Sequence, residues 1–215
     1  MIIDLKRLKL DKVVIRHSLD IYEFIRHVIR IERRLFNMVK EHLFVLSINR
    51  KSYVISLELV ALGSDSQVTA DPVEVFSLPV YKRAAGVILV HNHPSGTLQP
   101  SEEDRDVTDR LIQSGRILKR PVIDHVIITD YSYYSFKDSG LLECIENSLK
   151  YVPPYELERQ FYDQMQQEIK RLKKEHKIKN QQSLQKVAKN MLKEGLKPQV
   201  IQKVTGLSQE TINSL

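Results

Sequence analysis

The sequence predicts an α/β protein in which a mixed β-sheet is flanked by helices and followed by an all-helical C-terminal extension. Helical and strand-like patterns alternate through residues 1–150, as in domains whose sheet is covered by helices. Two pairs of strand patterns are separated only by short turns, which predicts antiparallel hairpins and therefore a mixed sheet. From about residue 151 the pattern becomes helical and highly charged.

Periodicity and turn residues place the individual elements of the first 150 residues. Pro79 lies inside an apolar helical pattern, where it should kink or split the helix. We expect helices at residues 18–38, 71–80 and 101–118, strands at residues 41–48, 53–61, 87–90, 121–129 and 133–136, and a loop at residues 63–67.

The sequence Pro153-Pro154 marks a boundary, so we divide the chain into a domain at 1–150 and a helical tail at 151–215. The tail predicts helices at residues 155–179, 183–194, 198–204 and 208–215. The first of these carries an apolar stripe that could pack on the domain or pair with a second copy of the chain as a homodimer. The stripe consists of Leu157, Phe161, Met165, Ile169 and Leu172.

Composition excludes several classes of protein. Apolar residues make up 42% of the 215 residues, which is enough for a hydrophobic core. The single cysteine, Cys144, excludes a disulfide framework and a thiolate zinc site, and it predicts a reducing cytoplasm. We expect neither a signal peptide in residues 1–17 nor a membrane span, because no apolar run approaches ~18 residues.

The net charge of +6 is concentrated in the tail. Residues 1–150 contain 21 Lys and Arg against 20 Asp and Glu, whereas residues 151–215 contain 12 against 7. This asymmetry indicates either an anionic partner for the tail, such as nucleic acid, or a solvated basic helix.

The stretch from His91 to Asp104 contains the candidate metal ligands. Two histidines one residue apart follow an apolar strand, and a turn containing Pro94 and Gly96 comes next. A carboxylate then returns in the first turn of the helix that begins at Ser101. Two nitrogen ligands and one oxygen ligand, with room for a fourth, are typical of a catalytic zinc site. The stretch therefore predicts a metallohydrolase.

Two other zinc hydrolase classes do not fit the sequence. It has no His-Glu-x-x-His helix, which the zincin metalloproteases require. A nucleic-acid deaminase needs a Pro-Cys-x-x-Cys motif, which a single cysteine cannot supply.

The candidate metal-ligand residues and their spacing resemble those of a known family. An upstream glutamate, a His-x-His pair, ten residues and an aspartate form the JAMM motif of MPN/JAB-domain zinc metalloproteins. Over residues 18–142 the amino-acid sequence resembles the RadC branch of this family. The segments that carry the resemblance are His91-Asn92-His93-Pro94-Ser95-Gly96, Pro100-Ser101, Asp104, Asp124-His125, Tyr134-Ser135-Phe136 and Glu58-Leu59-Val60. The resemblance implies a JAB-like mixed sheet, layered with helices as in cytidine deaminases. RadC proteins usually begin with a helix–hairpin–helix DNA-binding region, which we expect to be absent here.

The resemblance also implies a role for each site residue. His91, His93 and Asp104 would hold Zn²⁺, with a water in the fourth position. Glu41 would act as the general base, with Glu58 as the alternative. The hydroxyl of Ser101 would help to stabilise the tetrahedral oxyanion.

Two of these motifs have structural interpretations as well. Ser101 and Asp104 have the spacing of a helix capping box, which is compatible with metal binding because it would fix Asp104. The pair Asp124-His125 either orients a metal ligand or has a purely structural role.

These features predict two functions. The first is zinc-dependent hydrolysis of an amide bond in a peptide or protein substrate, including an isopeptide bond, by a water that Glu41 activates. The alternative is a non-catalytic, DNA-associated accessory module that acts through the basic tail. The RadC name carries an association with DNA repair. Residues 200–212 resemble a helix-turn-helix and the tails of some bacterial transposase-related nucleases, but residues 208–215 contain no Arg or Lys.

Overall fold

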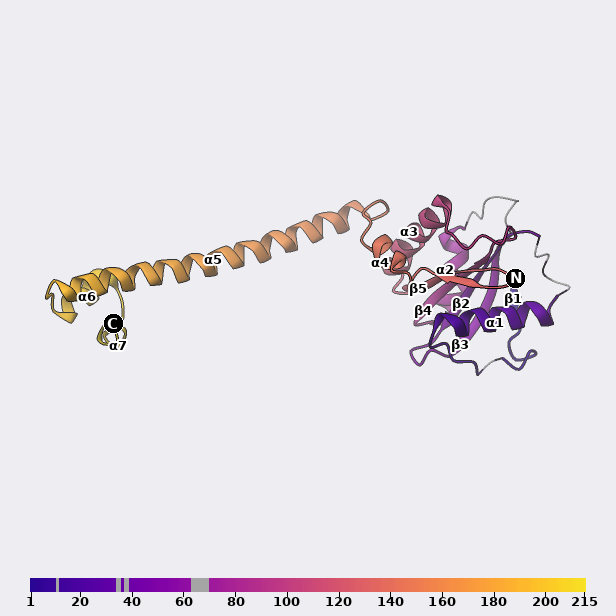
Figure 1. The fold of residues 1–215 in the computed structure, drawn as a ribbon, viewed down its shortest axis with the longest axis horizontal. Coiled ribbons are helices and arrows are strands. Elements are labelled where there is room, and N and C mark those ends of the chain that lie inside the picture. The colour runs from indigo at the N-terminus through magenta and orange to yellow at the C-terminus, as the bar shows by residue number, and fades with distance from the viewer. Residues whose placement is uncertain (11, 34–35, 37–38, 63–69) are drawn as a thin grey trace. The chain divides into compact units, whose positions relative to one another are not determined.

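A mixed β-sheet forms the centre of the first part of the chain (Figure 1). The computed structural model describes residues 1–10, 12–33, 36, 39–62 and 70–215, and these residues divide into two units, Met1–Val152 and Pro153–Leu215. Within the described residues the sheet has six strands in the order β1-β3-β2-β4-β5-β6. The strands are β1 (Ile2–Ile3), β2 (His42–Ile48), β3 (Val54–Leu62), β4 (Gly86–Asn92), β5 (Val122–Ile128) and β6 (Tyr133–Ser135).

The strand pairing confirms the mixed sheet. β2 pairs with β3 and β5 pairs with β6 as antiparallel hairpins, as the short turns predict, while β4 and β5 are parallel. The sequence patterns did not reveal β1, which pairs with the outer edge of β3. Two residues are too few to show the alternation of polar and apolar side chains that identifies a strand.

Helices cover both faces of this sheet. On one face, α1 (Ser18–Ile31) packs against residues such as Phe44 and Val90. On the other face, α2 (Pro72–Tyr81), α3 (Glu102–Ile117) and α4 (Leu141–Glu146) pack against residues such as Val45 and Leu89. Successive residues of β2 and β4 thus alternate between two hydrophobic cores, which explains why these strands are apolar throughout.

Two predicted helices differ from the observed ones. Helix α1 ends at Ile31 rather than near residue 38, because the backbone of Glu32 leaves the helical conformation; residues 34, 35, 37 and 38 lie outside the described residues. Helix α2 is not split at Pro79. Proline there removes only the hydrogen bond to the carbonyl of Val75, and just two residues of the helix follow it. The expected loop at residues 63–67 also lies outside the described residues.

The second unit is built on one long helix. Helix α5 (Pro154–Lys193) contains 40 residues and is about 60 Å long, at ~1.5 Å per residue. The two separate helices predicted at residues 155–179 and 183–194 are therefore wrong. The intervening residues, Asn180-Gln181-Gln182, include neither glycine nor proline, so nothing in them interrupts the backbone hydrogen bonds.

The end of the tail folds back on itself through two short helices, α6 (Pro198–Thr205) and α7 (Gln209–Asn213). Gly206 lies between them with a φ of +69°, and the Ser208 side chain caps α7, as the sequence indicates. Ala188 of α5, Ile201, Leu207 and Ile212 form a small buried core. Among the described residues, no helix is both long and apolar enough to cross a membrane.

Candidate metal centre

The two histidines of the motif lie where β4 ends. His91 is still part of β4 and is buried, with its side chain on the face that α3 covers. His93 follows the strand, and its backbone N–H donates to the carbonyl of Ile128 at 3.0 Å. Gly96 closes the turn with a φ of +79°, a left-handed conformation that glycine adopts without strain. The chain then reverses direction and enters α3.

The first turn of α3 brings Asp104 back to the histidines. Ser101 and Asp104 form the predicted capping box: the Asp104 N–H donates to Ser101 Oγ at 3.0 Å, and the Ser101 N–H donates to Asp104 Oδ2 at 2.8 Å. The Ser101 hydroxyl donates to the same Oδ2 atom at 2.7 Å. The cap therefore fixes both the start of the helix and the orientation of the Asp104 carboxylate.

The ligand atoms of His91, His93 and Asp104 converge on one point. His91 Nε2 lies 2.8 Å from His93 Nε2 and 3.1 Å from Asp104 Oδ1, while His93 Nε2 lies 3.5 Å from Asp104 Oδ2. Four tetrahedral ligands at ~2.0 Å from a zinc ion would lie about 3.3 Å apart. The three side chains are thus close enough to hold a single ion, and they form a candidate metal cluster among the described residues.

The hydrogen bonds of His93 determine which of its ring nitrogens is available. Its Nδ1 lies 2.7 Å from the carbonyl of Thr97. Because a carbonyl can only accept, Nδ1 must carry the proton, which leaves the lone pair of Nε2 facing Asp104 and His91.

A longer chain of hydrogen bonds orients His91. The Thr108 hydroxyl donates to the backbone carbonyl of Asp104, so it must accept from His125 Nδ1, 2.6 Å away. His125 Nε2 is then an acceptor and receives the proton of His91 Nδ1 at 2.8 Å. His91 Nε2 therefore also presents a lone pair to the point shared with His93 and Asp104. Two lone pairs and a carboxylate aimed at one point suit a cation, so the donor set fits a metal ion.

Burial and charge act on the protonation of this cluster. Burial lowers the pKa of His125 well below its ordinary value, which keeps the ring neutral, as the hydrogen-bond chain requires. Burial alone would raise the pKa of Asp104, but the adjacent imidazoles of His91 and His93 and the hydroxyl of Ser101 hold that pKa far below its usual range. Burial lowers the pKa of His93, but the neighbouring Asp104 carboxylate, the Thr97 carbonyl and the charge of Glu41 outweigh burial, so this pKa is raised overall.

Asp124 and His125 are adjacent in the sequence but have different roles in the structure. His125 contacts His91, as described above. Asp124 instead accepts hydrogen bonds from the Ser135 hydroxyl at 2.6 Å and from the backbone N–H groups of His125 and Lys137, and thereby fixes the hairpin of β5 and β6. Burial raises the pKa of Asp124.

Strand register brings Glu41 to the cluster. β2 and β4 are antiparallel with Leu43 opposite His91, so continuing this register by two residues sets Glu41 opposite His93. The side chain of Asn92 holds the backbone on both sides of Glu41: its Oδ1 accepts from the His42 N–H at 2.8 Å, and its Nδ2 donates to the Lys40 carbonyl at 3.0 Å.

Glu41 and the three candidate ligands line the same pocket. The pocket has a volume of about 210 Å³, and its wall also includes Ser101. Glu58 lies elsewhere: its Oε1 atom is 3.9 Å from the N-terminal amino group of Met1, and it lines a separate depression beside α2. The structure thus brings Glu41, and not Glu58, together with His91, His93, Ser101 and Asp104.

Sequence reasoning missed three residues that support the site. Asn92 holds the entry to β2, Thr97 fixes the His93 ring, and Thr108 completes the chain to His125. For Asn92 a signal was available, because a buried strand position occupied by asparagine requires hydrogen-bond partners. Thr97 and Thr108 gave no such signal: Thr97 contributes only its backbone carbonyl, and Thr108 has the ordinary pattern of a helical threonine.

Comparisons with known proteins agree with this geometry. Residues 15–141 match the model of the RadC-like JAB domain, and residues 181–215 match that of the C-terminal HTH domain of the Rpn/YhgA-like nuclease family. A UPF0758 protein of Clostridium acetobutylicum is 44% identical over 109 residues, which cover 51% of this chain and 47% of the relative. A UPF0758 protein of Syntrophomonas wolfei is 40% identical over 129 residues, covering 60% and 54%, respectively. The chain spans about half the length of the curated relatives it matches.

Proposed function

The chain belongs to the family of RadC-like JAB domains, and from this premise we propose that it is a zinc-dependent hydrolase of an amide bond in a peptide or protein, including an isopeptide bond. One observation carries the proposal: His91, His93 and Asp104 converge in a pocket that Glu41 also lines. A site that only held a structural metal would need no carboxylate beside the ligands and no open pocket.

His91, His93 and Asp104 would hold the metal through Nε2, Nε2 and the carboxylate. Zinc, when bound, would supply a Lewis acid that polarises the substrate carbonyl and lowers the pKa of water toward ~7. Glu41 would take the proton from the attacking water at its carboxylate and deliver it to the leaving amine. His125 and Thr108 would keep the His91 ring in the required tautomer.

Ser101 requires a change of partner to act on the substrate. Its single hydroxyl proton is directed at Asp104 Oδ2, where it supports the carboxylate. To stabilise a developing oxyanion, the hydroxyl would turn from Asp104 toward the pocket that Ser101 also lines. We therefore assign Ser101 first to positioning Asp104 and second to the oxyanion.

Metal analysis of the purified 215-residue chain tests the first half of the proposal. We expect about one zinc ion per chain, as for a three-ligand catalytic site, and none in the double variant His91→Ala, His93→Ala. Two histidines and one carboxylate also occur in non-haem iron enzymes, so iron is measured in the same samples. Zinc bound equally by the double variant would contradict the proposal.

Mass spectrometry of a mixed peptide library, incubated with the zinc-loaded protein, tests the second half. Cleavage that the wild type performs and the Glu41→Gln variant does not would support amide hydrolysis. If no peptide or isopeptide-linked probe is cleaved by a fully zinc-loaded wild type, the proposed activity is wrong even though the metal site stands.

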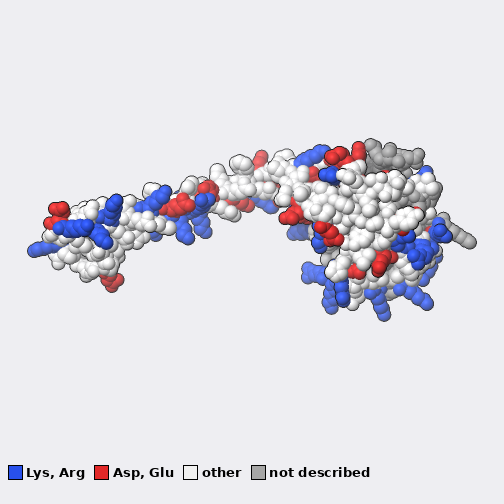
Figure 2. All heavy atoms as spheres, in the orientation of Figure 1, with Lys and Arg blue, Asp and Glu red and all other residues white. Residues whose placement is uncertain are grey.

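A second function is favoured by the charge of the tail and by its similarity to an HTH domain. Between residues 170 and 203 the chain carries eleven Lys and Arg and only two Glu. Figure 2 shows these basic side chains along α5 and around its end. We propose that the tail binds nucleic acid through phosphate contacts, since α7 contains no Arg or Lys to read bases.

The affinity of the 215-residue chain for a DNA duplex, measured at several salt concentrations, tests this second function. Neutralising Lys186, Lys189 and Lys193 to Gln should lower the salt dependence by about three ions, at ~0.9 per phosphate contact. As the matched control, neutralising Lys6, Lys9 and Lys12 in the first unit should leave it unchanged. Equal slopes for the two triple variants would rule out the tail as the binding surface.

The exposed stripe on α5 supports a further proposal, a homodimer formed through the segment 155–179. Phe161, Met165, Ile169 and Leu172 are all exposed. Pairing two such helices would bury the stripe. Sedimentation equilibrium should show a dimer, and the double variant Met165→Lys, Ile169→Lys should dissociate it. A wild-type monomer would contradict the proposal.

We also propose a cytoplasmic location, from the single free thiol of Cys144.

A further inference from the structure

The metal pocket is negatively charged, whether or not an ion is bound. Of the described residues that line it, three carry carboxylates and none is Lys or Arg. The carboxylates belong to Glu41, Glu103 and Asp104. Zinc would bring two positive charges, which the carboxylates of Asp104 and Glu41 would offset, because the histidine ligands are neutral. The charge of Glu103 would then be the one left over.

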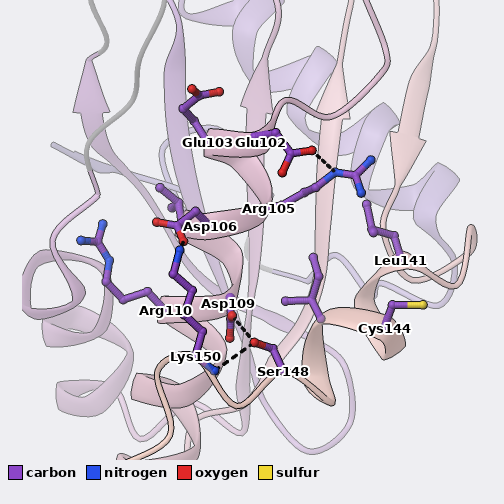
Figure 3. Close-up of a pocket in the computed structure, with 12 residues that line it drawn as sticks. Glu102, Glu103, Arg105, Asp106, Asp109, Arg110, Leu141, Cys144, Ser148 and Lys150 are labelled. Atoms are coloured by element: carbon purple, nitrogen blue, oxygen red, sulfur yellow. Dashed lines mark hydrogen bonds and ion pairs between the residues drawn. The ribbon is translucent and has the colours of Figure 1, made fainter.

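Glu103 is exposed, so a ligand can reach its carboxylate. The basic side chain nearest to it in the sequence, Arg105, lies 4.0 Å from Glu102 instead. Figure 3 shows this pair, and it shows the Glu103 carboxylate pointing away from both partners at the first turn of α3. Within the described part of the chain, Glu103 makes no side-chain hydrogen bond or ion pair. Its carboxylate is therefore available to a cation that a ligand brings.

Basic residues on the other side of α3 are engaged elsewhere. Glu103 also borders the larger pocket of Figure 3, between α3 and α4, which Arg110 and Lys150 line as well. Arg110 donates to the backbone carbonyl of Ala70, and Lys150 pairs with Asp106. Neither basic residue lines the metal pocket, so Glu103 is not neutralised where it borders that pocket.

An apolar side chain lies beside this carboxylate. Val107 follows Glu103 by four residues in α3 and lines the metal pocket too. Residues four apart share one face of a helix, and helical side chains lean toward the N-terminus, so Val107 covers the turn that holds Glu103. A Lys or Arg side chain packs its aliphatic stem on apolar surface and keeps its charged end in water. Such a side chain fits this edge of the pocket better than an acidic or a purely apolar one.

The remaining exposed residues of the pocket are uncharged. The loop between β4 and α3 contributes Ser95, Thr97 and Gln99 to the lining. Their polar groups can bond to any peptide backbone, and they do not distinguish a basic side chain from an acidic one. Selection by charge therefore falls to Glu103. The pocket has a volume of only about 210 Å³, so a side chain at Glu103 would belong to a residue next to the reacting bond.

We propose that Glu103 selects a Lys or Arg side chain in a residue that flanks the cleaved bond, with the aliphatic stem on Val107 and the cationic group at the Glu103 carboxylate. The inference rests on the proposed function, because it takes the metal pocket as the place where a peptide is cleaved. An exposed ion pair contributes modestly, so a basic residue should be preferred over an uncharged one of the same length by about two- to fivefold.

Amino-acid hydroxamates test the inference without cleavage, because a hydroxamate binds a metal ion and holds the neighbouring side chain in the pocket. In Nα-acetyl amino-acid hydroxamates the side chain lies on the carbonyl side of the metal-binding group. In succinyl hydroxamates coupled to an amino-acid amide it lies on the amine side. Both series are titrated calorimetrically into the zinc-loaded 215-residue chain. In one series, the lysine compound should have a Kd about two- to fivefold below that of the norleucine compound, which lacks the ammonium.

Charge reversal tests whether Glu103 is the selecting group. In the Glu103→Lys variant the glutamate compound of the same series should bind more tightly than the lysine compound. Glu74→Lys is the matched control, because Glu74 is also an exposed acid in the first turn of a helix but lines a different depression. It should keep the preference for lysine. Equal affinity of the lysine and norleucine compounds in both series, or an unchanged preference in Glu103→Lys, would overturn the inference.

The outcome is separable from that of the proposed function. Zinc-loaded protein that prefers the lysine hydroxamate but cleaves no peptide would leave the role of Glu103 in place and refute the hydrolase. Peptide cleavage without enrichment of Lys or Arg on either side of the cleaved bonds, and without a lysine preference among the hydroxamates, would do the reverse.

Discussion

Two buried threonines make the same local hydrogen bond in the two units of the chain, but only one of them belongs to a network. Thr108 of α3 and Thr205 of α6 each donate to the backbone carbonyl four residues earlier. Thr205 accepts from the neighbouring Leu207 N–H, whereas Thr108 accepts from His125, which in turn holds His91.

The metal pocket and the tail also differ as whole regions in whether their polar groups form a network. Around the metal pocket, polar groups from β2, β4, β5 and α3 fix one another at hydrogen-bond distance. In the tail, the small core is apolar and the charges lie on the exposed surface of one long helix. The first arrangement suits chemistry at a single point, and the second suits diffuse attraction to a charged surface. Changes at the metal pocket should therefore have effects that fall with distance from the ligand atoms.

The largest effect is expected for Asp104→Ala. It removes one candidate ligand and the acceptor of the capping box together. Zinc binding, measured by competition with a chromogenic chelator, should be lost entirely. The control Asp163→Ala removes an exposed carboxylate in the tail and should bind zinc normally. Wild-type zinc affinity in Asp104→Ala would mean that the ion is held elsewhere.

Glu41→Gln should strongly reduce turnover while leaving zinc bound. Loss of a general base lowers the rate by about 10²–10⁴-fold. Glu58→Gln is the matched control, because Glu58 lies in a different depression. The two variants are compared by turnover of a cleaved peptide and by zinc content. The assignment would be reversed if Glu58→Gln were the inactive variant.

Thr108→Val should weaken zinc binding by about 10–100-fold, the usual effect of losing a group that orients a ligand. Valine has the shape of threonine but cannot accept the proton of His125 Nδ1, so the His91 ring loses its support. Thr205→Val makes the same change in the tail and should leave the zinc affinity unchanged. If both variants bind zinc like the wild type, the hydrogen-bond chain does not contribute to affinity.

Asn92→Ala should give the smallest of these effects on the metal. It leaves the His42 N–H and the Lys40 carbonyl without their buried partner, at a cost of about 1–3 kcal/mol in the free energy of unfolding. Zinc content should be unchanged, but turnover should fall because Glu41 is no longer held in place. Chemical denaturation and peptide turnover measure the two effects. Unchanged turnover would show that Glu41 does not depend on Asn92.

Features that depend on nearby residues could be predicted from the sequence. The hairpins, the capping box of Ser101 and Asp104, and the turn and cap around Gly206 all follow from residue preferences within a few positions. The convergence of His91, His93 and Asp104 also lies within fourteen residues of sequence. The boundaries of α1 and α5 were missed, because apolar periodicity does not mark where backbone hydrogen bonding stops.

By itself, the sequence determined the candidate ligand set and the element that follows it, since a strand end, a tight turn and a capped helix leave little freedom over so short a segment. Tertiary structure alone decided which glutamate joins the ligands. Glu41 and His93 are brought together by the register of β2 and β4, set by contacts along both strands, and Glu58 is kept away by pairing on the far side of β2. It also decided that His125 supports His91. These relationships join residues far apart in the chain, and packing rather than local preference fixes them.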